Sequence, residues 1–456
     1  MCPEQSSNKI VRSNLQFGGI VELVAGEFPP HLYEKFYGPF NGIKDYPSQP
    51  KFQAPPDGVI EHNAAEYEPI ADGSIIKLSD GRLMLAQGNG IGESLDRTTC
   101  RFSEDGGATW SKAEPVDWGM GVGGMIRLAS GALAIYGGKT RQRGKTYFSR
   151  STDEGRTWLE PIHIPTHPEF YPMFNSLIQL TSGRLLLCGY WGSAELDCYA
   201  PDLWKLDETN TGWWRGLKVP FEGHRRPSMG ICKTYYSDDE GVTWQGCKGG
   251  VFGWFSAQGV PDGTSGITDV YEPSVAETAD GRLLMFARCK RGRLVQSYSL
   301  DGGEHWLSMQ PTELSCSQSP ALLVRIPSSG DLLCIWNQVS AKEIRRGMQR
   351  SRLSSAISTD SGENWHHFKT IDACEGMPDM GHIAPEFPIP CLLRGNFELG
   401  KVPDNYYSVD YPNIDIVEDQ VFVRYSRQWC MQTGEETAEK TGAGVLRIYP
   451  LDWFYR

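Results

Sequence analysis

The chain has 456 residues, 39% of them hydrophobic, and carries a net charge of −12 at pH 7. This balance argues against nucleic acid as a partner, because phosphate binding requires a basic face. No run approaches the roughly 18 apolar residues of a membrane-spanning helix, so we expect no membrane span. The 51 glycines and 29 prolines are typical of a turn-rich β protein.

The first residues, MCPEQSSNKIVRSN, contain no apolar segment of the kind found in secretory signals. We therefore expect a cytoplasmic protein, although a secreted protein that had lost its leader would show the same pattern. The 12 cysteines lack the spacing of a zinc site, and several fall within apolar strands. Reduced, buried thiols and the absence of a metal are the simplest expectation.

Six hairpin patterns follow one another along the chain, each with two short apolar strands around a tight turn. They cover residues 73–87, 124–137, 175–189, 273–288, 321–337 and 412–427. After each of the first five comes the pattern Ser-x-Asp-x-Gly-x-x-Trp, at 103–110, 151–158, 237–244, 299–306 and 358–365. This pattern is a turn in which Asp bonds backbone N–H groups, Gly adopts a conformation other residues resist, and Trp folds back onto the sheet.

Each unit thus reads as strand, turn, strand, loop, third strand, Trp turn and short fourth strand. Four-stranded units repeated every 48 to 86 residues predict an all-β fold, a six-bladed β-propeller, within a single domain over 1–456. The last blade lacks the Trp turn. We expect residues 444–454 to supply its third strand and residues 17–26, within an N-terminal extension of 1–60, to close the ring. Five or seven blades stay open, because residues 192–230 and 366–405 are long and irregular.

The Trp turn resembles the Asp-box, or BNR repeat, of the sialidase (neuraminidase) superfamily, and the likeness extends over roughly residues 60–456. The resemblance implies an exo-acting glycoside hydrolase that removes a terminal acidic, sialic-acid-like sugar from a glycan, without metal or organic cofactor. Such enzymes hold the substrate carboxylate with three arginines. A tyrosine is the nucleophile, a glutamate polarises it, and an aspartate serves as acid/base.

Glu272 stands where the fourth hairpin begins, and Arg288 stands where it ends. Both side chains should therefore project into one mouth of the propeller, where a small ligand would bind. The alternative is an ion pair that closes the channel. The resemblance makes Glu272 the polarising carboxylate and Arg288 part of the carboxylate clamp.

The family carries a further arginine about eight residues before an Asp-box serine, and Arg350 matches it, since Ser358 opens the fifth box. Arg346 and Arg352 are neighbours that could take this role. Arginine suits a carboxylate because its planar fork binds both oxygens. An arginine-rich loop can equally be a solvated surface.

By the same resemblance, the catalytic tyrosine opens the innermost strand of the last blade. Tyr411 stands there, and Tyr407 is a weaker candidate. The acid/base aspartate belongs in the loop after the second strand of the first blade. Asp96 is the best candidate in that glycine-rich loop, and Glu93 is the next.

One departure from the family is clear, because its first arginine is missing. Asp72 and Glu68 stand in that region instead, and they would face a bound sugar with negative charge. Either Arg97, Arg141 or Arg225 fills the role, or the substrate is a different sugar whose hydroxyls bind an acid, or the site is degenerate.

Two loops, 187–206 and 210–230, combine aromatic and basic residues, among them Trp191, His224 and Arg225. They could form a lid or subsite wall, or pack between blades. A uronic-acid-directed glycosidase or polysaccharide lyase is the enzymatic alternative, because a lyase needs a base and a group that neutralises the uronate. The non-enzymatic alternative is a propeller that binds glycans without catalysis.

Overall fold

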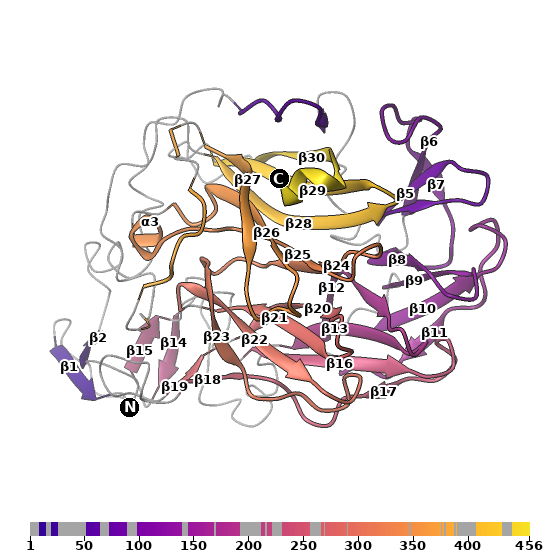
Figure 1. Ribbon diagram of the computed structural model, residues 1–456. Coiled ribbons are helices and arrows are strands. Elements are labelled where there is room, and N and C mark those ends of the chain that lie inside the picture. Colours follow the sequence, from indigo (N-terminus) through magenta and orange to yellow (C-terminus); the bar gives the residue numbers. More distant parts are fainter. Residues whose placement is uncertain are drawn as a thin grey trace.

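The computed structural model shows six four-stranded antiparallel sheets arranged around one axis (Figure 1). It describes residues 9–14, 20–25, 52–63, 73–88, 98–138, 145–167, 170–191, 211–214, 217–220, 230–255, 266–268, 270–289, 291–345, 348–374, 376–377, 380–386, 389, 407–430 and 440–456. The all-β, six-bladed prediction is therefore confirmed.

The blades follow the predicted order of strands. Blade 1 contains β4 (Ser74–Lys77), β5 (Leu83–Gly88), β6 (Thr98–Ser103) and β7 (Glu114–Val116). Blade 2 contains β8 (Gly124–Arg127), β9 (Leu133–Gly137), β10 (Thr146–Ser151) and β11 (Ile162–Ile164). Blade 3 contains β12 (Phe170–Gln179), β13 (Leu185–Trp191), β16 (Ile231–Ser237) and β17 (Gln245–Gly246).

Blade 4 contains β20 (Tyr271–Glu277), β21 (Leu283–Arg288), β22 (Arg293–Ser299) and β23 (Gln310–Ser315). Blade 5 contains β24 (Leu322–Arg325), β25 (Leu332–Trp336), β26 (Arg352–Ser358) and β27 (His366–Ala373). Blade 6 contains β28 (Ser408–Val417), β29 (Gln420–Cys430), β30 (Lys440–Pro450) and β3 (Ile60–Asn63). The first strands, β4, β8, β12, β20, β24 and β28, each contact the next and β28 returns to β4, so the ring is closed.

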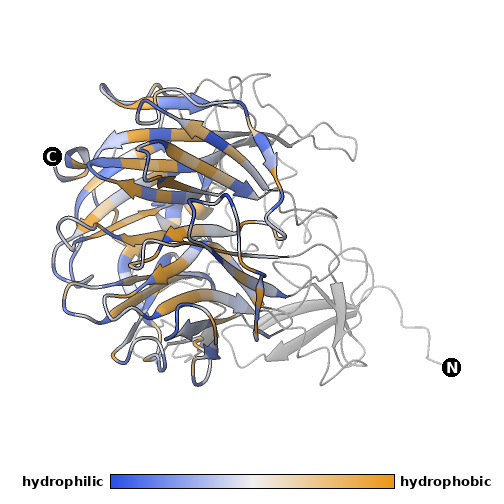
Figure 2. Ribbon diagram, turned by 90° about the vertical axis from the view of Figure 1, so that its right-hand side faces the viewer, coloured by the Kyte–Doolittle hydropathy of each residue, from blue (hydrophilic) through white to orange (hydrophobic). Residues whose placement is uncertain are grey.

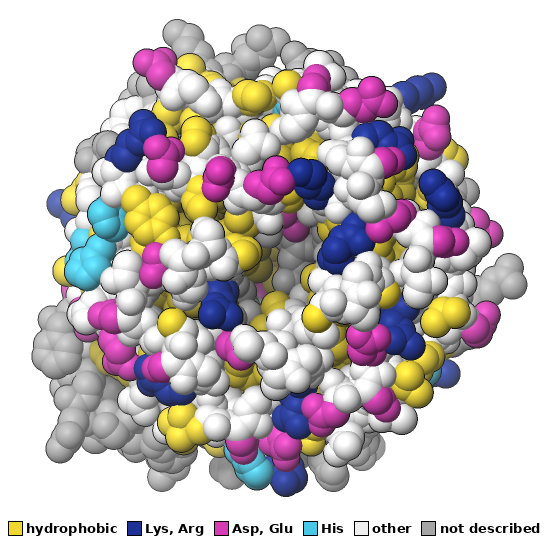
Figure 3. All heavy atoms as spheres, turned by 45° about the vertical axis from the view of Figure 1, so that its right-hand side comes forward, with side chains coloured by type: hydrophobic (Ala, Val, Ile, Leu, Met, Phe, Trp, Pro, Cys, Tyr) yellow, Lys and Arg dark blue, Asp and Glu magenta, His cyan; other side chains and the backbone are white. Residues whose placement is uncertain are grey.

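Smaller elements complete the described structure. They are the hairpins β1 (Lys9–Asn14) with β2 (Ile20–Ala25), β14 (Thr211–Trp214) with β15 (Leu217–Pro220) and β18 (Gly253–Phe255) with β19 (Gly266–Thr268), helix α3 (Ala341–Arg345) and the 3-10 turn η4 (Leu451–Tyr455). Along the blades, hydrophobic residues follow the strands while the turns are hydrophilic (Figure 2). Figure 3 shows one face of the ring, where acidic and basic side chains surround a central hollow.

The strand that closes the ring is β3, and the expectation that residues 17–26 do so is wrong. β2 pairs with β1 in a separate hairpin, whereas β3 pairs with β30. Charged contacts hold β3 in this place. Glu61 of β3 lies between two buried arginines, accepting hydrogen bonds from Arg427 at 2.9 and 3.0 Å and from Arg447 at 2.7 Å.

Each Asp-box turn is held by the same hydrogen bonds. In the first, Asp105 accepts from the backbone N–H of Thr109 at 2.8 Å and from its hydroxyl at 2.7 Å. The backbone N–H of Gly107 donates to Ser103 at 2.8 Å. The backbone contacts recur in the other four boxes, around Asp153, Asp239, Asp301 and Asp360. In the last two boxes the side chains of His305 and Asn364 take the place of the threonine hydroxyl. The turns are therefore locally determined.

The Asp-box residues also join neighbouring blades. Gly241 of blade 3 has φ of +89°, and a Cβ there would stand 2.0 Å from the ring of Phe148 in blade 2. Trp244 packs on the same Phe148, with ring centroids 5.3 Å apart. Trp110 likewise joins a cluster with Phe422 of blade 6. Each box thus packs against the preceding blade.

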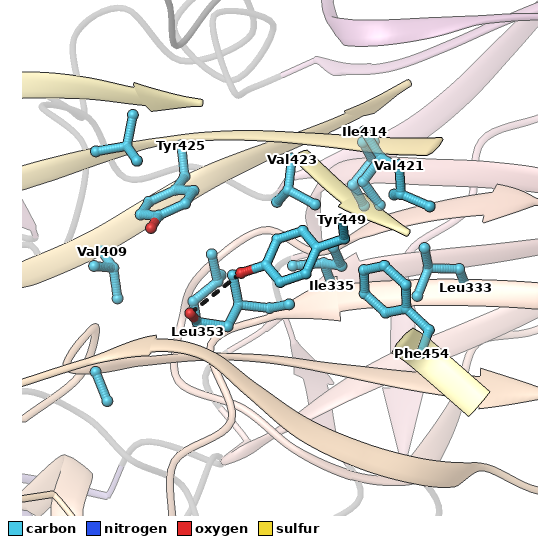
Figure 4. Close-up of a cluster of buried hydrophobic side chains, with 14 of the residues drawn as sticks. Leu333, Ile335, Leu353, Val409, Ile414, Val421, Val423, Tyr425, Tyr449 and Phe454 are labelled. Carbon is cyan, nitrogen blue, oxygen red and sulfur yellow. Dashed lines mark hydrogen bonds between the residues drawn. The ribbon is translucent and has the colours of Figure 1, made fainter. Parts of the chain in front are cut away.

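In blade 6, η4 replaces the missing Asp-box. Its Phe454 is fully buried in a cluster with Leu333 and Leu353 of blade 5 and Tyr449 of blade 6 (Figure 4). The hydroxyl of Tyr455 donates to Asp331 in blade 5 at 2.6 Å. A locally different turn therefore provides the same contact with the preceding blade.

We predict that Glu61→Gln destabilises the protein by about 3–5 kcal/mol, because two buried arginines lose their shared carboxylate. Burial opposes ionisation of Glu61, but its hydrogen bonds and charge interactions with Arg427 and Arg447 outweigh this and hold its pKa below the ordinary 4.5. The contribution of Glu61 to stability should be present above pH 4.5 and be lost as the pH falls through the lower pKa of the folded state. Urea unfolding of wild type and variant at pH 7 and pH 3 would measure the stability loss and its pH dependence. Equal stability of wild type and variant at pH 7 would contradict the prediction.

Candidate functional site

Three of the innermost strands bulge near one another, and each bulge holds a non-glycine residue with positive φ. These residues are Asn175 in β12, Glu272 in β20 and Tyr411 in β28, with φ of 51°, 50° and 53°. The strand pairing shifts at each position. Such backbone costs about 1–3 kcal/mol per residue and is concentrated at functional sites. Glu272 and Tyr411 are both followed by proline, so the same local sequence builds both bulges.

The bulges bring Tyr411 and Glu272 together across the axis. The Tyr411 hydroxyl donates to Oε1 of Glu272 at 3.3 Å. The other carboxylate oxygen, Oε2, lies 3.0 Å from Nε of Arg288. The carboxylate side chain is 7% exposed. A phenol, a carboxylate and a guanidinium are therefore linked in one row.

The Arg288 side chain is buried and makes its contacts within the protein. Its side chain is 2% exposed, and its NH1 group donates to the carbonyl oxygen of Gln318 at 3.3 Å. Its guanidinium carbon lies 5.9 Å from the ring centre of Tyr271. The ion pair with Glu272, one of the two possibilities weighed from the sequence, is thus present, and Arg288 holds Glu272 in place.

Arg350 approaches the same tyrosine from blade 5. Its guanidinium carbon lies 5.2 Å from the ring centre of Tyr411, and NH1 donates to Oδ2 of Asp410 at 2.6 Å. Burial opposes its charge, but Asp410 and Tyr411 outweigh this and raise the pKa of Arg350. Its side chain is 24% exposed, so part of the side chain is accessible to solvent. That Arg288 and Arg350 clamp one ligand carboxylate stays a prediction.

The structure assigns two alternative candidates to internal contacts. Tyr407 is fully buried, and its hydroxyl donates to Asp372 at 3.0 Å and to a backbone carbonyl. Arg352 is fully buried and pairs with Glu343 of α3 at 3.0 Å. Both side chains therefore make their polar contacts within the protein.

The remaining sequence candidates lie outside the described residues. They are Glu68, Asp72, Glu93, Asp96, Arg97, Arg141, His224, Arg225 and Arg346. Trp191 ends β13, but its side chain is also outside the description. The acid/base assignment and the replacement of the missing arginine therefore stay predictions.

Sequence reasoning missed Asp410, Tyr190 and Tyr271. Asp410 and Tyr271 directly precede Tyr411 and Glu272, so their places at the bulges could have been noticed. Tyr190 stands seven residues after its turn glycine, as Arg288 does after its own. This equal offset was a usable signal.

Polar contacts also join the innermost strands of blades 1, 3 and 6. The Ser74 hydroxyl and Asn175 lie 2.5 Å apart, joining blades 1 and 3. Arg424 pairs with Asp415 at 2.5 Å, and Asp415 accepts from the backbone of blade 1 at 2.9 Å. A small cavity is lined by Phe174, Pro273, Pro320 and Tyr411, among others.

The family comparison agrees with this architecture. The BNR repeat-like domain family matches residues 133–423. The chain belongs to this family. The expected relation to the BNR-repeat propellers of the sialidase superfamily is thus confirmed. A search of curated proteins finds no match.

Similar solved structures include a protein of unknown function from Dyadobacter fermentans, at 16% identity and a TM-score of 0.47, covering 88% of this chain and 96% of that one. A Hadza microbial sialidase is 14% identical with a TM-score of 0.48, covering 85% and 67%. Trypanosoma rangeli sialidase is 13% identical with a TM-score of 0.42, covering 98% of this chain and 58% of that one.

Within the described part of the chain, no three His, Cys, Asp or Glu side chains gather in a way that could hold a metal ion. The same residues include no helix long and apolar enough to cross a membrane.

Substitutions of Tyr411, at the site, and of Tyr407, in the core, should differ in their effect on the free energy of unfolding. Tyr407→Phe removes a hydrogen bond to the buried carboxylate of Asp372 and should cost about 1.5–3 kcal/mol. Tyr411→Phe removes a longer bond at a partly exposed site and should cost less than about 1 kcal/mol. Urea unfolding of both variants would compare them. Equal losses would contradict the division between core and site.

Proposed function

We propose that this protein is a glycoside hydrolase that removes a terminal acidic sugar, with Tyr411 as its nucleophile. The observation that carries the proposal is the contact between the Tyr411 hydroxyl and the Glu272 carboxylate, with Arg288 behind the carboxylate and Arg350 over the ring. A glycosidase-type function is also what the family relationship suggests.

The geometry suits a double displacement. As the Tyr411 oxygen forms a bond to the anomeric carbon, Glu272 accepts the phenol proton and the bond to the leaving oxygen breaks. The leaving oxygen takes a proton from an acid, a role we assign to Asp96. Water then attacks the glycosyl-tyrosine, the same residue acting as base, and the phenol regains its proton. Two displacements at one carbon retain its configuration.

A neutral phenol suits an acidic substrate, since an anionic nucleophile would be repelled by the sugar carboxylate. Glu272 lies behind the phenol, and its charge is partly balanced by Arg288 at 3.0 Å. Arg350 binds Asp410 through one terminal nitrogen, and its outward part can meet the substrate carboxylate.

A second candidate is a glycosidase for a sugar other than an ordinary sialic acid, such as a uronic acid. The observation that favours it concerns the two arginines of the site. Arg288 already pairs with Glu272, and Arg350 already pairs with Asp410. The positive field available to a ligand is therefore smaller than that of free guanidinium groups. Asp72 and Glu68 would lower it further if they face the mouth.

Tyr411→Phe and Glu272→Gln test the proposed mechanism directly. Each should lower kcat at least about a thousandfold, because the first removes the nucleophile and the second the proton acceptor. Release of a chromogenic leaving group from a panel of acidic glycosides measures this. Glu418→Gln, on the exposed turn of the same hairpin, is the control and should keep full activity. Near wild-type turnover in both site variants would refute the mechanism.

Asp410→Asn tests the second candidate. Removing the carboxylate that occupies Arg350 leaves a free cation, and charge interactions at this distance are worth a few kcal/mol at an intermediate dielectric. We expect the wild type to cleave a standard sialoside poorly and the variant to bind it about tenfold or more tightly. The KM for the sialoside measures the change. Efficient sialoside cleavage by the wild type would reject this candidate.

A further inference from the structure

Three tyrosines form an aromatic row along the wall between blades 3 and 4. Tyr171 of β12 stacks on Tyr190 of β13, with ring centroids 5.8 Å apart and planes 30° from parallel. Tyr190 in turn meets Tyr271 of β20 edge to face at 5.7 Å. Tyr171 is 53% exposed and Tyr271 only 5%. The aromatic row therefore leads from the surface to the residue beside Glu272.

The Tyr190 ring is fixed by its neighbours. Among the described residues its hydroxyl has no hydrogen-bond partner, and it is not one of the fully buried polar atoms. The hydroxyl lies among the charged groups of the site. Burial raises the pKa of Tyr190, the charge of Glu272 raises it further, and the charge of Arg288 opposes the rise. The phenol therefore stays protonated and is a hydrogen-bond donor at any physiological pH.

The fold also places Tyr190 where a site residue belongs. It is seven residues after Gly183, and Arg288 is seven residues after Gly281. Arg288 is the last residue of the second strand of its blade and Tyr190 the last but one of its own, so both stand beside the mouth of the ring. The fully buried Tyr407, by contrast, bonds its hydroxyl inside the protein.

We propose that Tyr190 is a substrate-binding residue whose hydroxyl donates a hydrogen bond to an oxygen of the sugar bound over Tyr411. The inference rests on the proposed function for the class of ligand, an acidic sugar. The stacked rings of Tyr171 and Tyr271 set the direction of the donor before the ligand arrives, so little side-chain entropy is lost on binding.

Tyr190→Phe removes only the hydroxyl and is the decisive variant. We expect it to bind N-acetylneuraminic acid about 3- to 10-fold more weakly than wild type in calorimetric titration, as for the loss of one neutral hydrogen bond. Its urea midpoint should not fall, because no internal bond is lost. Tyr407→Phe is the matched control, with a lower midpoint and unchanged affinity for the sugar acid.

Equal affinity of Tyr190→Phe and wild type would overturn the inference. A fall in its midpoint as large as that of Tyr407→Phe would do the same, as would a wild type that does not bind the sugar acid. The proposed hydrolase is judged separately, by turnover. If no chromogenic glycoside is cleaved but sugar binding depends on Tyr190, the hydrolase proposal fails and the binding role stands.

Discussion

The contact between each blade's terminal turn and the preceding blade is the constraint on which the structure depends. A β-sheet of four short strands cannot bury both faces alone, so each blade must pack on its neighbours. The Asp-box provides this contact five times through a tryptophan that packs on the preceding blade and, in four of the five boxes, through a glycine whose Cβ would collide with that blade. In blade 6, η4 achieves the same result with Phe454.

Ring closure adds a long-range constraint to these local ones. β3 and β28–β30 are separated by most of the chain, yet they share one sheet. Glu61, Arg427, Arg447 and Asp372 form a buried charged network that joins β3 to blades 5 and 6. Such a network tolerates few substitutions, because removing one partner leaves the others buried without compensation.

The site depends on the closed ring, because its residues come from different blades. Glu272 and Arg288 belong to blade 4, Arg350 precedes β26 of blade 5, and Tyr411 belongs to blade 6. Their side chains meet because strand bulges turn Glu272 and Tyr411 toward each other. Rigid strands rather than loops therefore set the distance between the proposed nucleophile and its base, which is how a precise site is best supported.

The repeated units and the offsets of Glu272, Arg288 and Tyr411 could be predicted from the residues alone, because turn chemistry and strand alternation act over a few residues. The sequence did not distinguish β3 from residues 17–26 as the closing strand, since both are short strand-like segments and the choice depends on arginines more than 360 residues away along the chain. Likewise, only the tertiary structure paired Arg350 with Asp410, buried Arg288 behind Glu272 and placed Tyr407 in the core. Ion pairs and burial depend on which side chains meet across blades, and no local pattern encodes that meeting.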